Sequence, residues 1–103
     1  MDEFKKLFEP IRIGNVTLKN RLVFLTTETL LTPKGHIGET LLNYYEARAR
    51  GGVGLIMASM VFPFNWDTLN VICLFKDSSI PEFKRLVDVI HSHNTPTFAQ
   101  VGL

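Results

Sequence analysis

Residues 44–56 read YYEARARGGVGLI, the end of an expected helix that runs directly into an expected strand. The helix pattern covers residues 39–50, and Gly51-Gly52 predicts its end because glycine readily takes the left-handed cap conformation. One helix face carries an apolar stripe made of Leu41, Leu42, Tyr45 and Ala49. Residues 53–58 are then uniformly apolar, which is typical of a strand covered on both faces. These features predict one helix–strand unit of a parallel sheet.

Two more strands are expected on either side of this unit. Residues 21–25 form a nearly continuous apolar run that suits a strand buried on both faces, and residues 96–101 have the character of a third strand. Ahead of them, residues 11–13 and 16–18 alternate apolar and polar side chains around Gly14-Asn15. Two such segments across a two-residue turn predict a β-hairpin.

A second helix is expected to begin at Ser79. Ser79 stands three residues before Glu82, the spacing of a capping box, and Pro81 falls in the first turn, where its missing N–H costs nothing. The apolar face of this helix consists of Phe83, Leu86, Val87 and Ile90. Asn94 is expected to end it in the left-handed conformation.

The expected order is hairpin, strand, helix, strand, helix, strand, which indicates an α/β protein with parallel strands. An open doubly wound sheet and a barrel both use such units. Residues 26–38 and 61–78 are expected to be long loops, and the first of them lacks a glycine-rich phosphate-binding pattern, which favours the barrel. We therefore expect an N-terminal hairpin plus the first three strands and two helices of a TIM (β/α)8 barrel, incomplete because the chain stops before closure.

Composition and charge argue against several classes of partner. The net charge is +1 with scattered basic residues, whereas nucleic-acid binding needs clustered ones. No apolar run approaches the ~18 residues of a membrane span. His91 and His93 are two residues apart on the expected helix and face apart, so no metal site is expected. The lone Cys73 lies in an apolar run, is expected to be buried, and indicates a reducing compartment, so we expect a cytoplasmic protein.

Three segments, in order, resemble one known family. Residues 7–14 (LFEPIRIG) and 18–21 (LKNR) are similar to the start of the Old Yellow Enzyme family of NADH:flavin oxidoreductases, which includes the bacterial 2,4-dienoyl-CoA reductases. Residues 44–56 resemble that family's first helix and second strand, and residues 80–100 hold a third match. Together the segments span nearly the whole chain.

The resemblance implies that residues 1–103 are the N-terminal fragment of an FMN-binding TIM-barrel domain. In that family NAD(P)H reduces the flavin, and hydride then passes to a small-molecule substrate, an activated alkene or enoyl thioester. We expect an FMN-dependent NAD(P)H oxidoreductase of the ene-reductase type, present as a fragment that is inactive alone. Leu103 stands where relatives carry His, and no catalytic residue is assigned.

The resemblance also marks candidate cofactor-binding residues after the first expected strand. Leu25, Thr26, Thr27 and Glu28 match the segment that lies along the flavin in the family. Relatives often carry Pro, an apolar residue, and Thr, Cys or His in place of the last three. An ionised Glu28 near the ring would disfavour the negatively charged reduced flavin and lower its potential. The alternative is that Glu28 points to solvent or pairs with a basic residue.

Met60 and Gln100 complete the set of candidate cofactor-binding residues. Met60 stands where relatives place a small residue near the flavin, and it either lines the ring or packs under the loop. Gln100 matches the family's glutamine at the end of the third strand, and its amide can both donate to and accept from the polar edge of the ring. The alternative is that this amide bonds to nearby backbone.

Two further hypotheses remain open. The first is a non-catalytic barrel fragment that self-associates, because the outer two strands would carry unpaired edges. The second is a TIM-barrel enzyme that binds no flavin.

Overall fold

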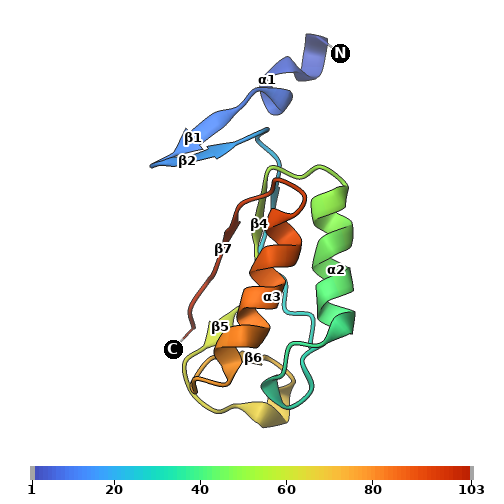
Figure 1. Cartoon of the computed structure of the whole chain (residues 1–103). Coiled ribbons are helices and arrows are strands. Elements are labelled where there is room, and N and C mark those ends of the chain that lie inside the picture. The colour runs from blue at the N-terminus through green and yellow to red at the C-terminus, as the bar shows by residue number, and fades with distance from the viewer. Residues whose placement is uncertain (1, 103) are drawn as a thin grey trace.

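The computed structural model describes residues 2–102. Leu103, which stands where relatives carry His, lies outside them. A short strand pair projects from one end of a sheet that is covered by two helices (Figure 1). The helices are α1 (Lys5–Phe8), α2 (Glu39–Arg50) and α3 (Ser79–His91), and the strands are β1 (Ile11–Ile13), β2 (Val16–Leu18), β3 (Val23–Phe24), β4 (Leu55–Met57), β5 (Val61–Phe62), β6 (Ile72–Cys73) and β7 (Thr97–Phe98). Turns of 3-10 helix add Asp2–Phe4, Pro33–Gly35 and Asp67–Leu69.

The central sheet is parallel, with strand order β3-β4-β7. Phe24 pairs with Ile56, and Met57 pairs with Phe98. The helices α2 and α3 are the crossover connections between these strands, which agrees with the predicted α/β class. Both β3 and β7 are edge strands in the described part of the chain, as the sequence predicted for the outer two strands.

The prediction that residues 21–25 form a strand buried on both faces is wrong in this structure. Only Val23 and Phe24 are in β3, and Val23 and Leu25 keep 40% and 69% of their surface exposed. The reason is geometric: β3 has one strand neighbour among residues 2–102, so much of its surface stays open to solvent.

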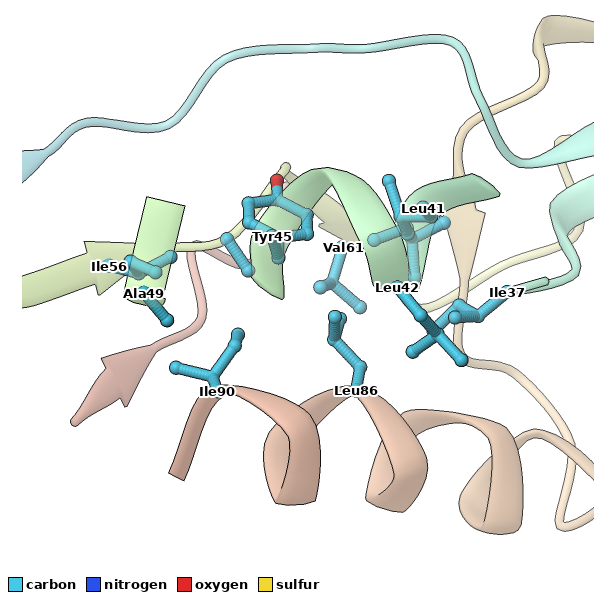
Figure 2. Close-up of a cluster of buried hydrophobic side chains, with 11 residues drawn as sticks. Ile37, Leu41, Leu42, Tyr45, Ala49, Ile56, Val61, Leu86 and Ile90 are labelled. Atoms are coloured by element: carbon cyan, nitrogen blue, oxygen red, sulfur yellow. The ribbon is translucent and has the colours of Figure 1, made fainter. Parts of the chain in front are cut away.

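The core lies between the sheet and the helix pair. Leu41, Tyr45 and Ala49 of α2 are almost fully buried, as their four-residue spacing predicted. All three belong to one buried cluster with Leu86 and Ile90 of α3, and Figure 2 shows Ala49 on the side of α2 that faces Ile90. The ring of Tyr45 lies among aliphatic groups, while its hydroxyl is on the side away from α3.

The predicted hairpin is present and is attached to the body of the molecule by polar contacts. The strands β1 and β2 pair antiparallel, with Gly14 of the turn at φ +59°. Lys19 donates to the carbonyl oxygen of His93 at 3.1 Å and to the Thr95 hydroxyl at 3.3 Å. Asn20 donates to the carbonyl oxygen of Gly52 at 2.7 Å. These bonds lie at the end of the sheet where β3 and β7 begin.

The prediction of one uninterrupted loop over residues 61–78 is wrong. It contains the parallel pair β5 and β6, in which Val61 pairs with Ile72 and Phe62 with Cys73. Two-residue strands are too short to produce a period-two pattern, so no sequence pattern predicts them. The predicted burial of Cys73 is confirmed, with 4% of its surface exposed.

The predicted capping box at Ser79 is also wrong. The N-cap residue is Ser78, and it makes no side-chain cap hydrogen bond. Ser79 donates instead to the Cys73 carbonyl oxygen, and the Glu82 carboxylate accepts from the backbone N–H of Ile37 at 3.1 Å. Glu82 is thus used to hold the loop before α2, a tertiary partner that local spacing does not reveal. The predicted left-handed stop is confirmed, since Asn94 has φ +57°.

Candidate cofactor site

The carboxyl ends of the three sheet strands lie side by side, and all six predicted cofactor-binding residues lie within four positions after a strand end. The chain after β4 is bonded to the chain after β7: Ala58 donates to the Phe98 carbonyl oxygen at 3.1 Å, and Val61 donates to that of Gln100 at 2.8 Å. On the other side, the hydroxyl of Ser59 donates to the carbonyl oxygen of Thr27 at 3.0 Å. The fold therefore brings the three predicted segments to one edge of the sheet.

Several candidate side chains at this edge are open to solvent. Leu25 is 69% exposed, and Thr27 and Gln100 are also exposed. Within residues 2–102 the amide of Gln100 makes no hydrogen bond, so the alternative in which it bonds to nearby backbone is not seen here. An exposed amide can both donate and accept, which suits a ligand that carries both kinds of group.

Thr26 contributes a spare donor. Its hydroxyl is buried and has no hydrogen-bond partner in the described part of the chain. A buried hydroxyl without a partner costs about 1–3 kcal/mol, and such groups are uncommon in native proteins. This side chain is therefore suited to a polar ligand group brought within its reach.

Glu28 has an exposed side chain, and no ion pair involving it is found among residues 2–102. The alternative in which it pairs with a basic residue is therefore not seen here. Partial desolvation raises the pKa of the Glu28 carboxyl above its usual value, and a hydrogen bond with the backbone of Thr29 partly offsets this. Glu28 thus places an unpaired carboxyl beside the other candidate residues.

Met60 is half-buried and packs against the small cluster of Phe62, Val71 and Cys73. A Cβ atom on Gly102 would collide with the Met60 sulfur and lie 2.8 Å from the Phe62 ring, so a larger residue there would force these side chains to shift. The packing alternative for Met60 is what the structure shows, and a contact of its side chain with a flavin ring stays a prediction.

Two residues of this region were not singled out as site residues from the sequence. Tyr45 and Ser59 are both fully buried, and their hydroxyl oxygens are 2.7 Å apart. The backbone N–H of Ser59 also donates to the Tyr45 hydroxyl at 2.6 Å. Tyr45 was predicted as part of the apolar stripe, and the stripe does not indicate where its hydroxyl points. A serine directly after an apolar strand was the available signal.

A cavity of about 460 Å³ lies at the opposite end of the sheet, beside the hairpin. It is lined by Thr17, Lys19, His91, Asn94, Thr95 and Pro96. The carboxyl ends of parallel strands are where barrel enzymes carry their sites, whereas the amino ends serve stability. We therefore place the candidate site at the strand ends and not in this cavity. Among the described residues there is no group of three His, Cys, Asp or Glu side chains that could hold a metal ion.

Comparison with known proteins finds relatives that match almost the whole chain. Residues 6–102 match the model of the NADH:flavin oxidoreductase / NADH oxidase family. The chain belongs to this family. It is 36% identical to an NADH oxidase of Thermoanaerobacter brockii over 98% of the chain and 16% of that relative. It is 34% identical to an N,N-dimethylglycine/sarcosine dehydrogenase of Chromohalobacter salexigens over 95% of the chain and 15% of that relative.

A solved structure of the family superposes closely. The Old Yellow Enzyme of Trypanosoma cruzi matches with a TM-score of 0.82 and 29% identity, over 96% of this chain and 27% of that one. The family is a TIM-barrel flavoprotein family whose cofactor is FMN and whose reductant is NAD(P)H. The chain therefore spans about a sixth of the two curated relatives and about a quarter of the solved structure.

The residues at the strand ends fit FMN by their chemistry. The isoalloxazine ring has apolar faces and a polar edge with donors and acceptors, and the site offers the exposed Leu25, the spare Thr26 hydroxyl and the Gln100 amide.

The helices described within residues 2–102 include none with the length and apolar character of a membrane span.

Proposed function

We propose that this chain supplies one wall of the FMN site of an ene-reductase-type, NAD(P)H-dependent oxidoreductase. In this proposal β3, β4 and β7 are the first three strands, and α2 and α3 the first two helices, of a TIM barrel, with residues 1–103 as the N-terminal part of its FMN-binding domain. The observation that supports it is the meeting of the three candidate segments at the carboxyl ends of adjacent parallel strands.

Bound FMN would supply the hydride-transfer chemistry toward an activated alkene or enoyl thioester. The residues of this chain would bind and orient the ring: the segment Leu25–Glu28 lies along it, and the Gln100 amide hydrogen-bonds its polar edge. The curated relatives differ in substrate, so the alkene substrate rests on the resemblance to Old Yellow Enzymes.

The proposal also covers the activity of these residues alone and the location of the protein in the cell. The 103 residues alone have no turnover, because three strands of an open sheet enclose too little of a ring and a substrate to exclude water. The location is cytoplasmic, where a lone buried thiol such as Cys73 stays reduced.

The test is a titration of the chain with FMN, in which binding is measured by the quenching of flavin fluorescence. We expect weak, saturable quenching that Gln100→Leu reduces further. Asn43→Leu is the matched control, because it replaces an exposed amide on α2, away from the strand ends. Absence of quenching in the unaltered chain, or equal loss in both variants, would contradict the proposal.

Glu28 is expected to lower the reduction potential of bound flavin. We expect its carboxylate to disfavour the negatively charged reduced flavin, so that Glu28→Gln raises the reduction potential of the bound flavin. A redox titration of the FMN-loaded protein measures this, and an unchanged potential would exclude the role.

A second candidate function, self-association without catalysis, is favoured by the exposed sheet edges. Val23, Leu25 and Val101 are all at least 40% exposed on or next to β3 and β7. Unpaired apolar edges promote strand pairing between molecules, and an edge lysine opposes it. Light scattering should then show oligomers of the unaltered chain and a smaller mass for Val23→Lys, whereas a monomer in both would exclude this candidate.

A further inference from the structure

Tyr45, Ser59 and Thr27 form a buried hydrogen-bond chain that runs from α2 to the candidate site. Tyr45 has 0% and Ser59 0% of its surface exposed. The Ser59 hydroxyl lies 2.7 Å from that of Tyr45 and 3.0 Å from the Thr27 carbonyl oxygen. The bonds therefore join the core helix, the end of β4 and the segment after β3.

The direction of each hydrogen bond follows from a count of protons. A serine hydroxyl has one hydrogen, and the carbonyl oxygen of Thr27 can only accept, so the hydrogen of Ser59 is donated to it. The Tyr45 hydroxyl must then donate to the Ser59 oxygen, and it accepts from the Ser59 N–H at 2.6 Å. Every member of the chain is satisfied in this one arrangement.

The arrangement requires a neutral Tyr45, because a phenolate has no hydrogen to donate. Burial raises the pKa of the Tyr45 hydroxyl above its usual value, and this outweighs the opposing effect of its bonds with Ser59. The phenol therefore stays protonated around neutral pH. A rigid ring in the core thus presents a fixed donor to the end of β4.

The segment that receives this support has few other contacts. Leu25–Leu30 lies outside any helix or strand, and most of its side chains are exposed. Leu30 has φ +57°, a left-handed conformation that is unfavourable for leucine. The Ser59–Thr27 bond is therefore a main anchor of the segment that the proposed function places along FMN.

We propose that Tyr45, acting through Ser59, is a positioning residue that fixes the Leu25–Glu28 segment for FMN binding. The inference rests on the proposed function for the identity of the ligand. The fixing of the segment itself is a property of this chain, and it is testable without the ligand.

Proteolysis after Glu28 by a glutamyl endopeptidase reports directly on this segment. We expect Tyr45→Phe and Ser59→Ala to speed cleavage after Glu28 about tenfold relative to cleavage after Glu9, the effect of losing one hydrogen bond in a local opening. Tyr44→Phe is the control, because Tyr44 packs against Arg48 and Phe24 and its hydroxyl makes no hydrogen bond among residues 2–102.

The Ser59→Ala variant distinguishes a local release of the segment from a general loss of the fold. It leaves the Ser59 N–H bonded to Tyr45, whereas Tyr45→Phe leaves that buried N–H without a partner. If both residues act along one path, the double variant should cleave no faster than the faster single variant. Independent, multiplying effects, or equal cleavage in Tyr45→Phe, Ser59→Ala and Tyr44→Phe, would overturn the inference.

Addition of FMN separates the inference from the proposed function. We expect FMN to slow cleavage after Glu28 in the unaltered chain and in Tyr44→Phe, and to lose this effect in Ser59→Ala. Variants that speed cleavage without FMN, together with no FMN effect in the unaltered chain, would support the fixing of the segment and contradict its use in flavin binding.

Discussion

The raised pKa of Glu28 makes the stability of the folded chain depend on pH. Its pKa is raised by partial desolvation, so the folded chain holds this proton more tightly than the unfolded chain does. Raising the pH from the usual value of 4.5 through the raised pKa therefore weakens the folded state relative to the unfolded one. This is the opposite of the usual behaviour of a salt-bridged carboxylate.

Glu28→Gln should remove this contribution. Urea unfolding should show that the free energy of unfolding of the unaltered chain, relative to that of the variant, falls as the pH rises above 4.5. Glu3→Gln serves as the control, because Glu3 is another exposed carboxylate, far from the strand ends in the chain. A difference between chain and variant that rises with pH would contradict the desolvated environment.

The candidate residues came from the resemblance to the family, and their placement after the strands came from the apolar runs before them. Leu25, Thr27 and Gln100 were expected at the strand ends, and they are there with exposed side chains. The hydrogen-bond roles of Tyr45 and Ser59 were not foreseen, because both partners of the bond are fourteen positions apart and only the folded crossover brings them together.

Among the secondary-structure elements, the start of β4 approaches Asn20 so closely that position 54 has room only for glycine. A Cβ atom on Gly54 would collide with the backbone and side-chain oxygens of Asn20. Asn20 is itself held by bonds to the Gly52 carbonyl oxygen at 2.7 Å and from the Leu22 N–H at 3.1 Å, so it cannot move aside freely. Glycine is required here for space.

Gly54→Ala should destabilise the fold by about 3 kcal/mol, the upper range for overpacking against fixed neighbours. The matched control is Gly38→Ala, where the added Cβ meets nothing within 4 Å and φ is −116°. Gly38 is the N-cap of α2, where alanine is less favourable than glycine, so that change should cost no more than about 1 kcal/mol. Urea unfolding measures both, and equal effects would contradict the close approach.

The start of α3 gives a second prediction at this scale. Glu82 accepts from the Ile37 N–H at 3.1 Å and lies 3.0 Å from the ring of His36, whereas Ser79 makes one longer bond of 3.3 Å. Glu82→Ala should therefore cost about 1.5 kcal/mol and Ser79→Ala about 0.5 kcal/mol. A larger loss in Ser79→Ala would restore the capping box that the spacing predicts.

The elements themselves were predictable in proportion to their length. The twelve residues of α2 and the thirteen of α3 carry full apolar stripes, and their positions were expected almost to the residue. The pair β5 and β6 has two residues in each strand, which is too short for any periodic signal. Its pairing depends on the loop closing on itself, a tertiary event.

In the molecule as a whole, the order of elements predicted parallel strands, and the resemblance to the family then assigned candidate residues to the segments that follow them. The order β3-β4-β7 then places the chain after β4 between the other two segments, which explains why Ser59 and Val61 can bond in both directions. The exposure of β3 could not be read from its apolar sequence, because burial depends on which neighbours are present.

Amide hydrogen exchange with mass spectrometry measures whether FMN binds at the carboxyl ends of β3, β4 and β7. FMN should slow exchange in peptides that cover residues 25–28, 58–61 and 99–101. Exchange in the hairpin, residues 11–18, should not change. Slowing confined to the residues that line the cavity beside the hairpin, or no slowing anywhere, would rule out FMN binding at the strand ends.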